Sequence, residues 1–306
     1  MKWRKLGRIF CAAGEYPWMQ THAANPLAES LEGSLVRIYF NSRDGRNRAF
    51  VSWLVIDLRQ PTEILELSRQ PALSPGPRGA FDDSGVSLGC LVHTGEMSLL
   101  YYVGWNLGGT TPWRNAIGLA RRPSLSTGEP LFERIGPGPL LDRDLYDPYN
   151  LSYPWVIREA DSWKMWYGTN IAPTPADLLD IPHAFKYADS LDGVSWTRHH
   201  QRLCLGGELA GDCAFTRPCV MHDPDCYRMW YCHRGEAYQL GYAESADGLA
   251  WIRYDERVGI APSADGWDSG SLAYPSVFDH GGERYLLYNG TRYGASGFGL
   301  AVLEEA

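Results

Sequence analysis

The stretch "YPSVFDHGGERYLLYNG" (residues 274–290) decides the fold of this chain, because its pattern recurs. A Pro opens an apolar run, a Gly-rich turn follows, and a second apolar run ends the unit. The segments "SYPWVIREADSWKMWYG" (152–168) and "TRPCVMHDPDCYRMWYC" (216–232) have the same form, and in all three a Tyr lies thirteen residues after the Pro. Two short apolar runs around a turn predict a β-hairpin, so the chain is a series of repeated hairpins.

The same spacing extends the repeat into the N-terminal half of the chain. It links Pro26 to Tyr39, and Leu88 to Tyr101 with Leu in place of Pro. A third apolar run follows each hairpin, and in repeats three and four an Asp-Gly turn leads to a fourth run at Trp196 or Trp251. Four short antiparallel strands per unit are typical of a propeller blade. We expect an all-β, five-bladed β-propeller, as a single domain over residues 1–306 with repeats starting near 25, 87, 153, 217 and 274.

The fifth repeat lacks a fourth apolar run, because the sequence stops at residue 306 just after the third. The segment "WRKLGRIF" (3–10) resembles the fourth-strand openings "WTRH" and "WIRY" of repeats three and four. We therefore expect the N-terminal strand to complete blade five, which would close the ring without an exposed sheet edge.

Charge and composition exclude several classes of partner. The chain has 306 residues and a formal net charge of −8, so it presents no basic field for nucleic acid or an anionic membrane surface. No apolar stretch long enough for a signal-peptide core lies in the first thirty residues, so we expect a cytoplasmic protein. The seven Cys form no CxxC pair, and we expect buried free thiols.

The repeat also predicts where a site would be, because in a propeller the loops that enter strand one and leave strand two meet at one end of the axis. The polar and aromatic residues of these loops suit a sugar, since rings stack on sugar C–H faces while carboxylates and Arg bond vicinal hydroxyls. We expect a saccharide or a sugar-containing small molecule as partner. The substrate-binding candidates are His22, Asn25, Arg43, Asp44, Asp82, Trp105, Asp147, Asn150, Tyr153, Arg217, His233, Tyr274, Asn289 and Arg292.

These repeats also carry a family resemblance. The motifs "FDDSG" (81–85), "DPYNLSYP" (147–154), "FTRPCV" (215–220) and "GYAESADGLAW" (241–251), with the closing 267–290 segment, resemble those of the five-bladed propeller glycosidases. That superfamily includes glycoside hydrolase families 43, 32 and 130, and the chain is most similar to an uncharacterised bacterial branch often found beside surface-polysaccharide genes. The resemblance covers essentially the whole chain and implies a glycosidase-like enzyme of polysaccharide metabolism.

For the reaction, the resemblance implies an Asp of blade one as base or nucleophile, a Glu of a later blade as acid, and an orienting Asp of blade two. The chain departs from that pattern. Asn25 occupies the first-blade position, and "YNLSYP" offers no Glu in blade three. We therefore expect relocated catalytic carboxylates, Asp83 and Asp268 with Glu236 as a reserve acid, which hydrolysis would need at about 5 to 10 Å from each other.

Two alternatives to hydrolysis stay open. Arg43, Arg217 and Arg292, with His233, could bind a phosphorylated or activated sugar, as in a transferase or phosphorylase. A catalytically silent sugar-binding propeller is the other alternative, for which Asn25 is the supporting feature.

Asp83 could instead simply cap its own turn. We expect no cofactor, and an axial metal on the isolated His22 and His233 has weak support.

Overall fold

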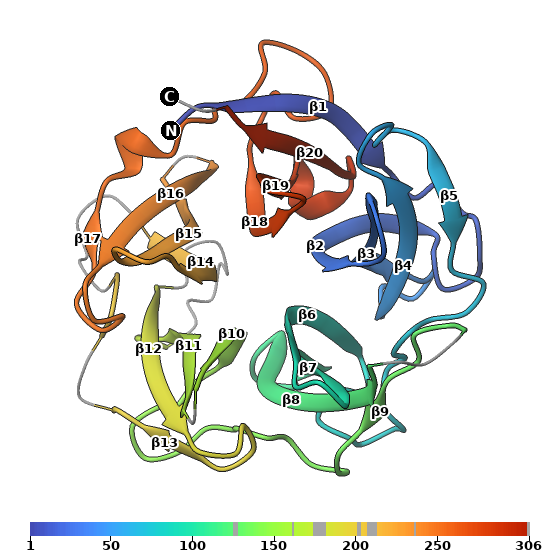
Figure 1. The fold of residues 1–306 in the computed structure, drawn as a ribbon. Helices are drawn as coiled ribbons and strands as arrows, with labels where there is room; N and C mark the ends of the chain where they lie inside the picture. Colours follow the sequence, from blue (N-terminus) through green and yellow to red (C-terminus); the bar gives the residue numbers. More distant parts are fainter. Residues whose placement is uncertain are drawn as a thin grey trace.

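The chain folds into β-sheets arranged as a ring around a central axis (Figure 1). The computed structural model describes residues 1–124, 128–160, 162–173, 182–200, 203–206, 213–235 and 237–304. The all-β class predicted from the sequence is confirmed, since the helices of this described part are the single 3-10 turns η1 (Asp255–Arg257) and η2 (Arg292–Gly294). None of its helices is long and apolar enough to cross a lipid bilayer.

Two sheets contain four strands each, in chain order from the axis outward. One comprises β10 (Leu151–Glu159), β11 (Ser162–Asn170), β12 (His183–Ser190) and β13 (Trp196–Arg198). The other comprises β14 (Cys213–His222), β15 (Tyr227–Arg234), β16 (Tyr238–Ser245) and β17 (Ile252–Arg253). The Asp-Gly turns predicted between the last two strands are present, and in the first of them Asp192 Oδ1 accepts the backbone N–H groups of Val194 and Ser195 at 2.8 and 2.7 Å.

In the N-terminal half, two four-stranded units join into one larger sheet. A single parallel pair, Ala49 with Gly85, joins β4 to β6. The first unit contains β2 (Thr21–Ser30), β3 (Leu35–Arg43), β4 (Ala49–Asp57) and β5 (Ile64–Leu67), and the second contains β6 (Gly85–His93), β7 (Met97–Leu107), β8 (Trp113–Pro123) and β9 (Glu133–Arg134).

The last sheet joins the two ends of the chain. Its order is β1 (Trp3–Phe10), β20 (Phe298–Leu303), β19 (Glu283–Asn289) and β18 (Ala273–His280). Antiparallel pairing runs from Trp3 opposite Leu303 to Phe10 opposite Phe298. Trp3 is buried, and its indole N–H donates to Val258 O at 2.9 Å. The N-terminal strand is therefore the outermost strand of the sheet that begins with β18 (Figure 1).

The core lies between neighbouring sheets and is rich in aromatic side chains. The Tyr that follows the Pro by thirteen residues is completely buried in every repeat, as alternation along a strand with two covered faces requires. These residues are Tyr39, Tyr101, Tyr167, Tyr231 and Tyr288. The repeated Tyr thus serves packing, as its strand position predicts.

The innermost strands β2, β6, β10, β14 and β18 each contain a break in register near the repeat's Pro or its Leu equivalent. In four of them the residue before the Pro has a positive φ, a conformation that L-residues rarely adopt. These residues are Asn25 (51°), Tyr153 (37°), Arg217 (56°) and Tyr274 (55°). Strained backbone of this kind clusters at functional sites, so a site is expected near the axis.

Candidate functional site

A cavity of about 370 Å³ lies where the innermost strands begin and the second strands end. It draws residues from four hydrogen-bonded sheets, so it depends on how these sheets are arranged around the axis. Its described lining comprises Arg43, Asn47, Ser87, Val103, Trp105, Leu107, Trp113, Asn115, Ser152, Tyr153, Asn170, His183, Ala214, Thr216, Arg234, Tyr238, Tyr274 and Tyr293.

Aromatic rings form much of this lining. The Tyr153 and Tyr274 rings lie 5.8 Å apart. Tyr238 extends the group, with its ring 6.5 Å from Tyr274 and 5.7 Å from Tyr293. Trp105 lies close against Gly85, where a Cβ atom would meet the indole at 2.4 Å, so that glycine provides the space for the Trp. These flat apolar faces can stack on sugar rings.

The charged groups of the lining are cationic. Arg43 and Arg234 line the cavity, and no carboxylate of the described residues does. His183 lies beside Arg234, and burial together with the Arg234 charge lowers the pKa of His183 to about 4, so this imidazole is neutral at physiological pH. Neutral imidazole, amides and hydroxyls complete the polar lining, which suits hydrogen bonding to a polar ligand.

Arg217 lies on the same axis but is buried, with 1% of its surface exposed. Its guanidinium donates to the carbonyls of Leu88, Asn25 and Pro26, the last two at 3.4 and 3.2 Å. It lies 5.9 Å from the centre of the Tyr153 ring. Burial lowers the pKa of Arg217, and no carboxylate of the described part pairs with it. This guanidinium joins three repeats across the axis.

Of the predicted binding residues, the structure brings Arg43, Trp105, Tyr153 and Tyr274 together in the cavity. Sequence reasoning missed the residues that begin the third strand of a unit, among them Trp113, His183 and Tyr238. They are paired with the ends of the second strands: Leu107 faces Trp113, Asn170 faces His183, and Arg234 faces Tyr238. Hairpin geometry was the signal, since the start of the third strand must adjoin the end of the second.

Comparisons with known proteins identify relatives of the whole chain. Uncharacterized protein MT1551 of Mycobacterium tuberculosis (strain CDC 1551 / Oshkosh) is 46% identical over 305 residues, and the match covers 100% of both sequences. Uncharacterized protein Rv1502 of strain ATCC 25618 / H37Rv matches with the same identity and coverage. The chain belongs to the family of these two mycobacterial proteins. No protein-family model matches it.

Solved structures show what fold this family has. A glycoside hydrolase superposes with a TM-score of 0.75 at 16% identity, covering 99% of this chain and 93% of that one. A thermostable family-43 glycoside hydrolase gives 0.68 at 17% identity, covering 94% and 91%. An endo-arabinase from Bacteroides thetaiotaomicron gives 0.65 at 10% identity, covering 98% of both. The family therefore has the propeller fold of glycoside hydrolases of the family 43 and 32 type.

Two of the three carboxylates expected to be catalytic, Asp83 and Asp268, do not line the cavity. Asp83 does not line the cavity, and it accepts the backbone N–H of Gly79 and the hydroxyl of Ser84, both at 2.9 Å, as a turn-capping Asp does. Asp268 is buried, pairs with Lys5 at 2.6 Å and accepts the Tyr288 hydroxyl at 3.3 Å. Glu236 lies outside the described residues. A catalytic role for any of the three stays a prediction.

Asp268 shares its arrangement with Asp82 and Asp147, two of the predicted binding residues. Each is buried and accepts the hydroxyl of the Tyr twenty positions later, and each also pairs with a cation of an outer strand. The Tyr–cation sets are Tyr102 with Arg134, Tyr167 with Arg198, and Tyr288 with Lys5. We call these three sets the Asp–Tyr clasps. They bind the inner part of a sheet to its outer strand and do not line the cavity.

The other predicted binding residues do not line the cavity. Asn25, Asn150 and Asn289 are buried; Asn289 Oδ1 accepts the backbone N–H of Asn25 at 2.8 Å, and Asn150 Oδ1 accepts that of Asn115 at 2.9 Å. Asp44 binds its own turn and Arg48. The three remaining residues are His22, next to Thr21 Oγ1 at 2.9 Å; His233, with its ring 6.1 Å from Phe215; and Arg292, which is exposed.

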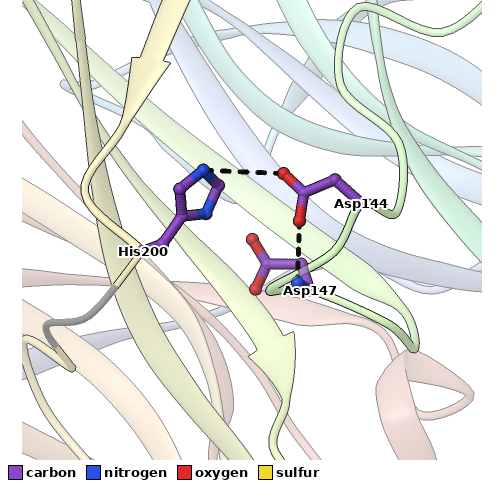
Figure 2. Close-up of side chains that lie close together, drawn as sticks. All are labelled: Asp144, Asp147 and His200. Carbon is purple, nitrogen blue, oxygen red and sulfur yellow. Dashed lines mark hydrogen bonds and ion pairs between the residues drawn. The ribbon is translucent and has the colours of Figure 1, made fainter.

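Figure 2 shows Asp144, Asp147 and His200, whose ligand atoms all lie within 4.8 Å of one another. The group would be a candidate metal site by residue type alone. Lys186 and Arg198 already contact the Asp147 carboxylate at 2.7 and 3.3 Å, and Arg198 also contacts Asp144 at 3.0 Å. Two cations therefore occupy the place of a divalent ion, and the residues present do not fit a metal.

Proposed function

We propose that this chain takes a saccharide or glycoconjugate into the axial cavity and acts on it as a glycosidase-like enzyme. The observation that carries the proposal is the cavity lining, in which six aromatic side chains converge with amide, hydroxyl and guanidinium groups at one end of a propeller axis. Rings that stack on sugar faces beside groups that bond hydroxyls are the composition a sugar site needs. The proposal includes a five-bladed ring closed by the N-terminal strand, acting in the cytoplasm.

Hydrolysis would need two carboxyl groups at the reacting bond. Asp83 and Asp268 are engaged outside the cavity, which weakens their candidacy. Glu236 is two positions in sequence from both Arg234 and Tyr238, which line the cavity, and this proximity keeps it as the candidate acid. Replacement of Glu236 by Gln should then abolish turnover while leaving sugar affinity within a few-fold of the unmodified protein.

A catalytically silent sugar-binding propeller is the second candidate function. The supporting observation is Asn25, which occupies the position of the expected first-blade Asp and whose side-chain Nδ2 donates to Asn41 Oδ1 at 3.3 Å. An amide cannot act as the base that this position would supply. Sugar binding without turnover of any glycoside would favour this candidate.

The test of saccharide binding compares two matched tyrosines. Tyr293 lines the cavity and is 49% exposed, whereas Tyr146 is 52% exposed and does not line it. The protein is first screened by thermal shift against monosaccharides and their aryl glycosides, and affinities are then measured by calorimetry. We expect Tyr293→Ala to weaken binding about five- to ten-fold through the loss of a stacking ring, and Tyr146→Ala to leave it unchanged.

If the Tyr293→Ala and Tyr146→Ala variants bind a sugar with equal affinity, that sugar does not bind in this cavity. A protein that binds no member of the panel would contradict the proposed function. Release of the aryl group in the same panel separates the enzyme from the binding-only propeller.

A further inference from the structure

We infer that the saccharide taken by the axial cavity carries an anionic group, a phosphate or a carboxylate, and that Arg43 binds it. The inference rests on the proposed function and names its class of substrate. It starts from a contrast of charge. The whole chain has a formal net charge of −8, yet Arg43 lines the cavity and has no carboxylate partner among the described residues.

Arg43 lies at the end of β3 and lines the cavity. Its Nη1 donates to the neutral side chain of Asn47, to Oδ1 at 2.7 Å, and Asn47 lines the cavity as well. The adjacent carboxylate, Asp44, is bound by Arg48 at 2.9 Å and by backbone N–H groups of its own turn. The charge of Arg43 is therefore left for a ligand, and its planar fork matches a phosphate or carboxylate.

The Arg43 charge acts on two titratable neighbours, His22 and Tyr153. Burial and the Arg43 charge lower the pKa of His22 to about 4, so this His adds no charge at neutral pH and leaves the guanidinium as the cation. The Arg43 charge also acts on the Tyr153 phenol, which lines the cavity. No anionic side chain of the described lining offsets it.

Arg217 is a further guanidinium close to Tyr153, 5.9 Å from the centre of its ring. It is buried, its partners are backbone carbonyls, and its Nε has no hydrogen-bond partner in the described part of the chain. A buried charge without a counter-charge is costly, and a ligand anion near Tyr153 would offset part of that cost. Arg217 does not line the cavity, so its contribution is a field and Arg43 supplies the contact.

The experiment measures the affinities of glucose, glucose 6-phosphate and glucuronate, with inorganic phosphate as a fourth probe, by calorimetry at low ionic strength. We expect at least one anionic sugar to bind about ten-fold or more tightly than glucose, because hydrogen bonds to charged groups are among the stronger ones. Arg43→Gln should remove most of this preference, and Arg43→Lys should retain part of it. Arg46→Gln is the control: it makes the same charge change on an exposed residue of the same loop that does not line the cavity.

The outcomes separate the inference from the function on which it rests. Glucose binding as tightly as both anionic sugars would overturn the inference and leave the saccharide function standing, as would an equal loss of preference in the Arg43 and Arg46 variants. Phosphate binding that depends on Arg43, with no sugar bound, would overturn the saccharide function and support the anion site. Failure of all four probes to bind would overturn both.

Discussion

Four residues of the innermost strands hold a backbone conformation that favours glycine, although each has a large side chain. Asn25, Tyr153, Arg217 and Tyr274 have φ between 37° and 56°, and a Pro follows each of them. Each such residue costs on the order of 1 to 3 kcal/mol, so surrounding contacts must hold it in place. Arg217 shows how: its guanidinium binds the carbonyls of Leu88, Asn25 and Pro26 in two other strands. Two of these residues, Tyr153 and Tyr274, line the cavity.

Replacing Arg217 by Met should destabilise the protein by about 3 kcal/mol, because three buried carbonyls lose their donor. Chemical denaturation measures the change in the free energy of unfolding. Arg217→Lys keeps the charge but loses the planar fork of the guanidinium. Its free energy of unfolding should lie between those of the unmodified protein and the Met variant. A Met variant as stable as the unmodified protein would mean that the axis does not depend on this guanidinium.

At the scale of elements, the Asp–Tyr clasps tie inner strands to outer ones. In the clasp of Asp147, the carboxylate accepts Tyr167 OH and Thr169 Oγ1 at 2.9 Å and pairs with Lys186 and Arg198. Burial by itself raises the pKa of Asp147, but these hydrogen bonds and charges outweigh it and lower the pKa below its ordinary value. The stabilisation is therefore complete at neutral pH and is lost as the pH falls below about 4.

Asp147→Asn should cost about 3 to 5 kcal/mol, because it leaves two cations with a weakened counter-charge, whereas Tyr167→Phe should cost about 1 kcal/mol for a single hydrogen bond. Urea denaturation at pH 7 and pH 3 tests both. The difference in the free energy of unfolding between the Asn variant and the unmodified protein should be smaller at pH 3, where the Asp is protonated in the unfolded chain. A difference independent of pH would argue against an ionic clasp.

At the scale of the molecule, the N-terminal strand links the two ends of the chain. β1 pairs with β20 along its length, Trp3 packs 6.3 Å from Trp230 of a different sheet, and Lys5 completes the clasp of Asp268. Its buried side chains Trp3, Ile9 and Phe10 each contribute to the core on folding.

Deletion of residues 1–10 should lower the melting temperature by at least about 10 °C, since three large side chains and a strand of hydrogen bonds are lost. Arg4→Ala serves as the control, because its side chain is 59% exposed on the same strand. An unchanged melting curve for the truncated chain would refute the role of β1 in joining the ring.

The sequence by itself determined the repeated hairpins, the strands that follow them and the buried Tyr of each unit, because these depend on spacing along the chain. It also predicted Arg43, Trp105, Tyr153 and Tyr274 as binding candidates, and these four line the cavity. Only the tertiary structure decided which polar groups share the cavity. Asp268 pairs with Lys5 from the opposite end of the chain, and His183 and Tyr238 reach the site through strand pairing. A local pattern fixes a residue's place on its strand, but its neighbours across the axis come from segments far away in sequence.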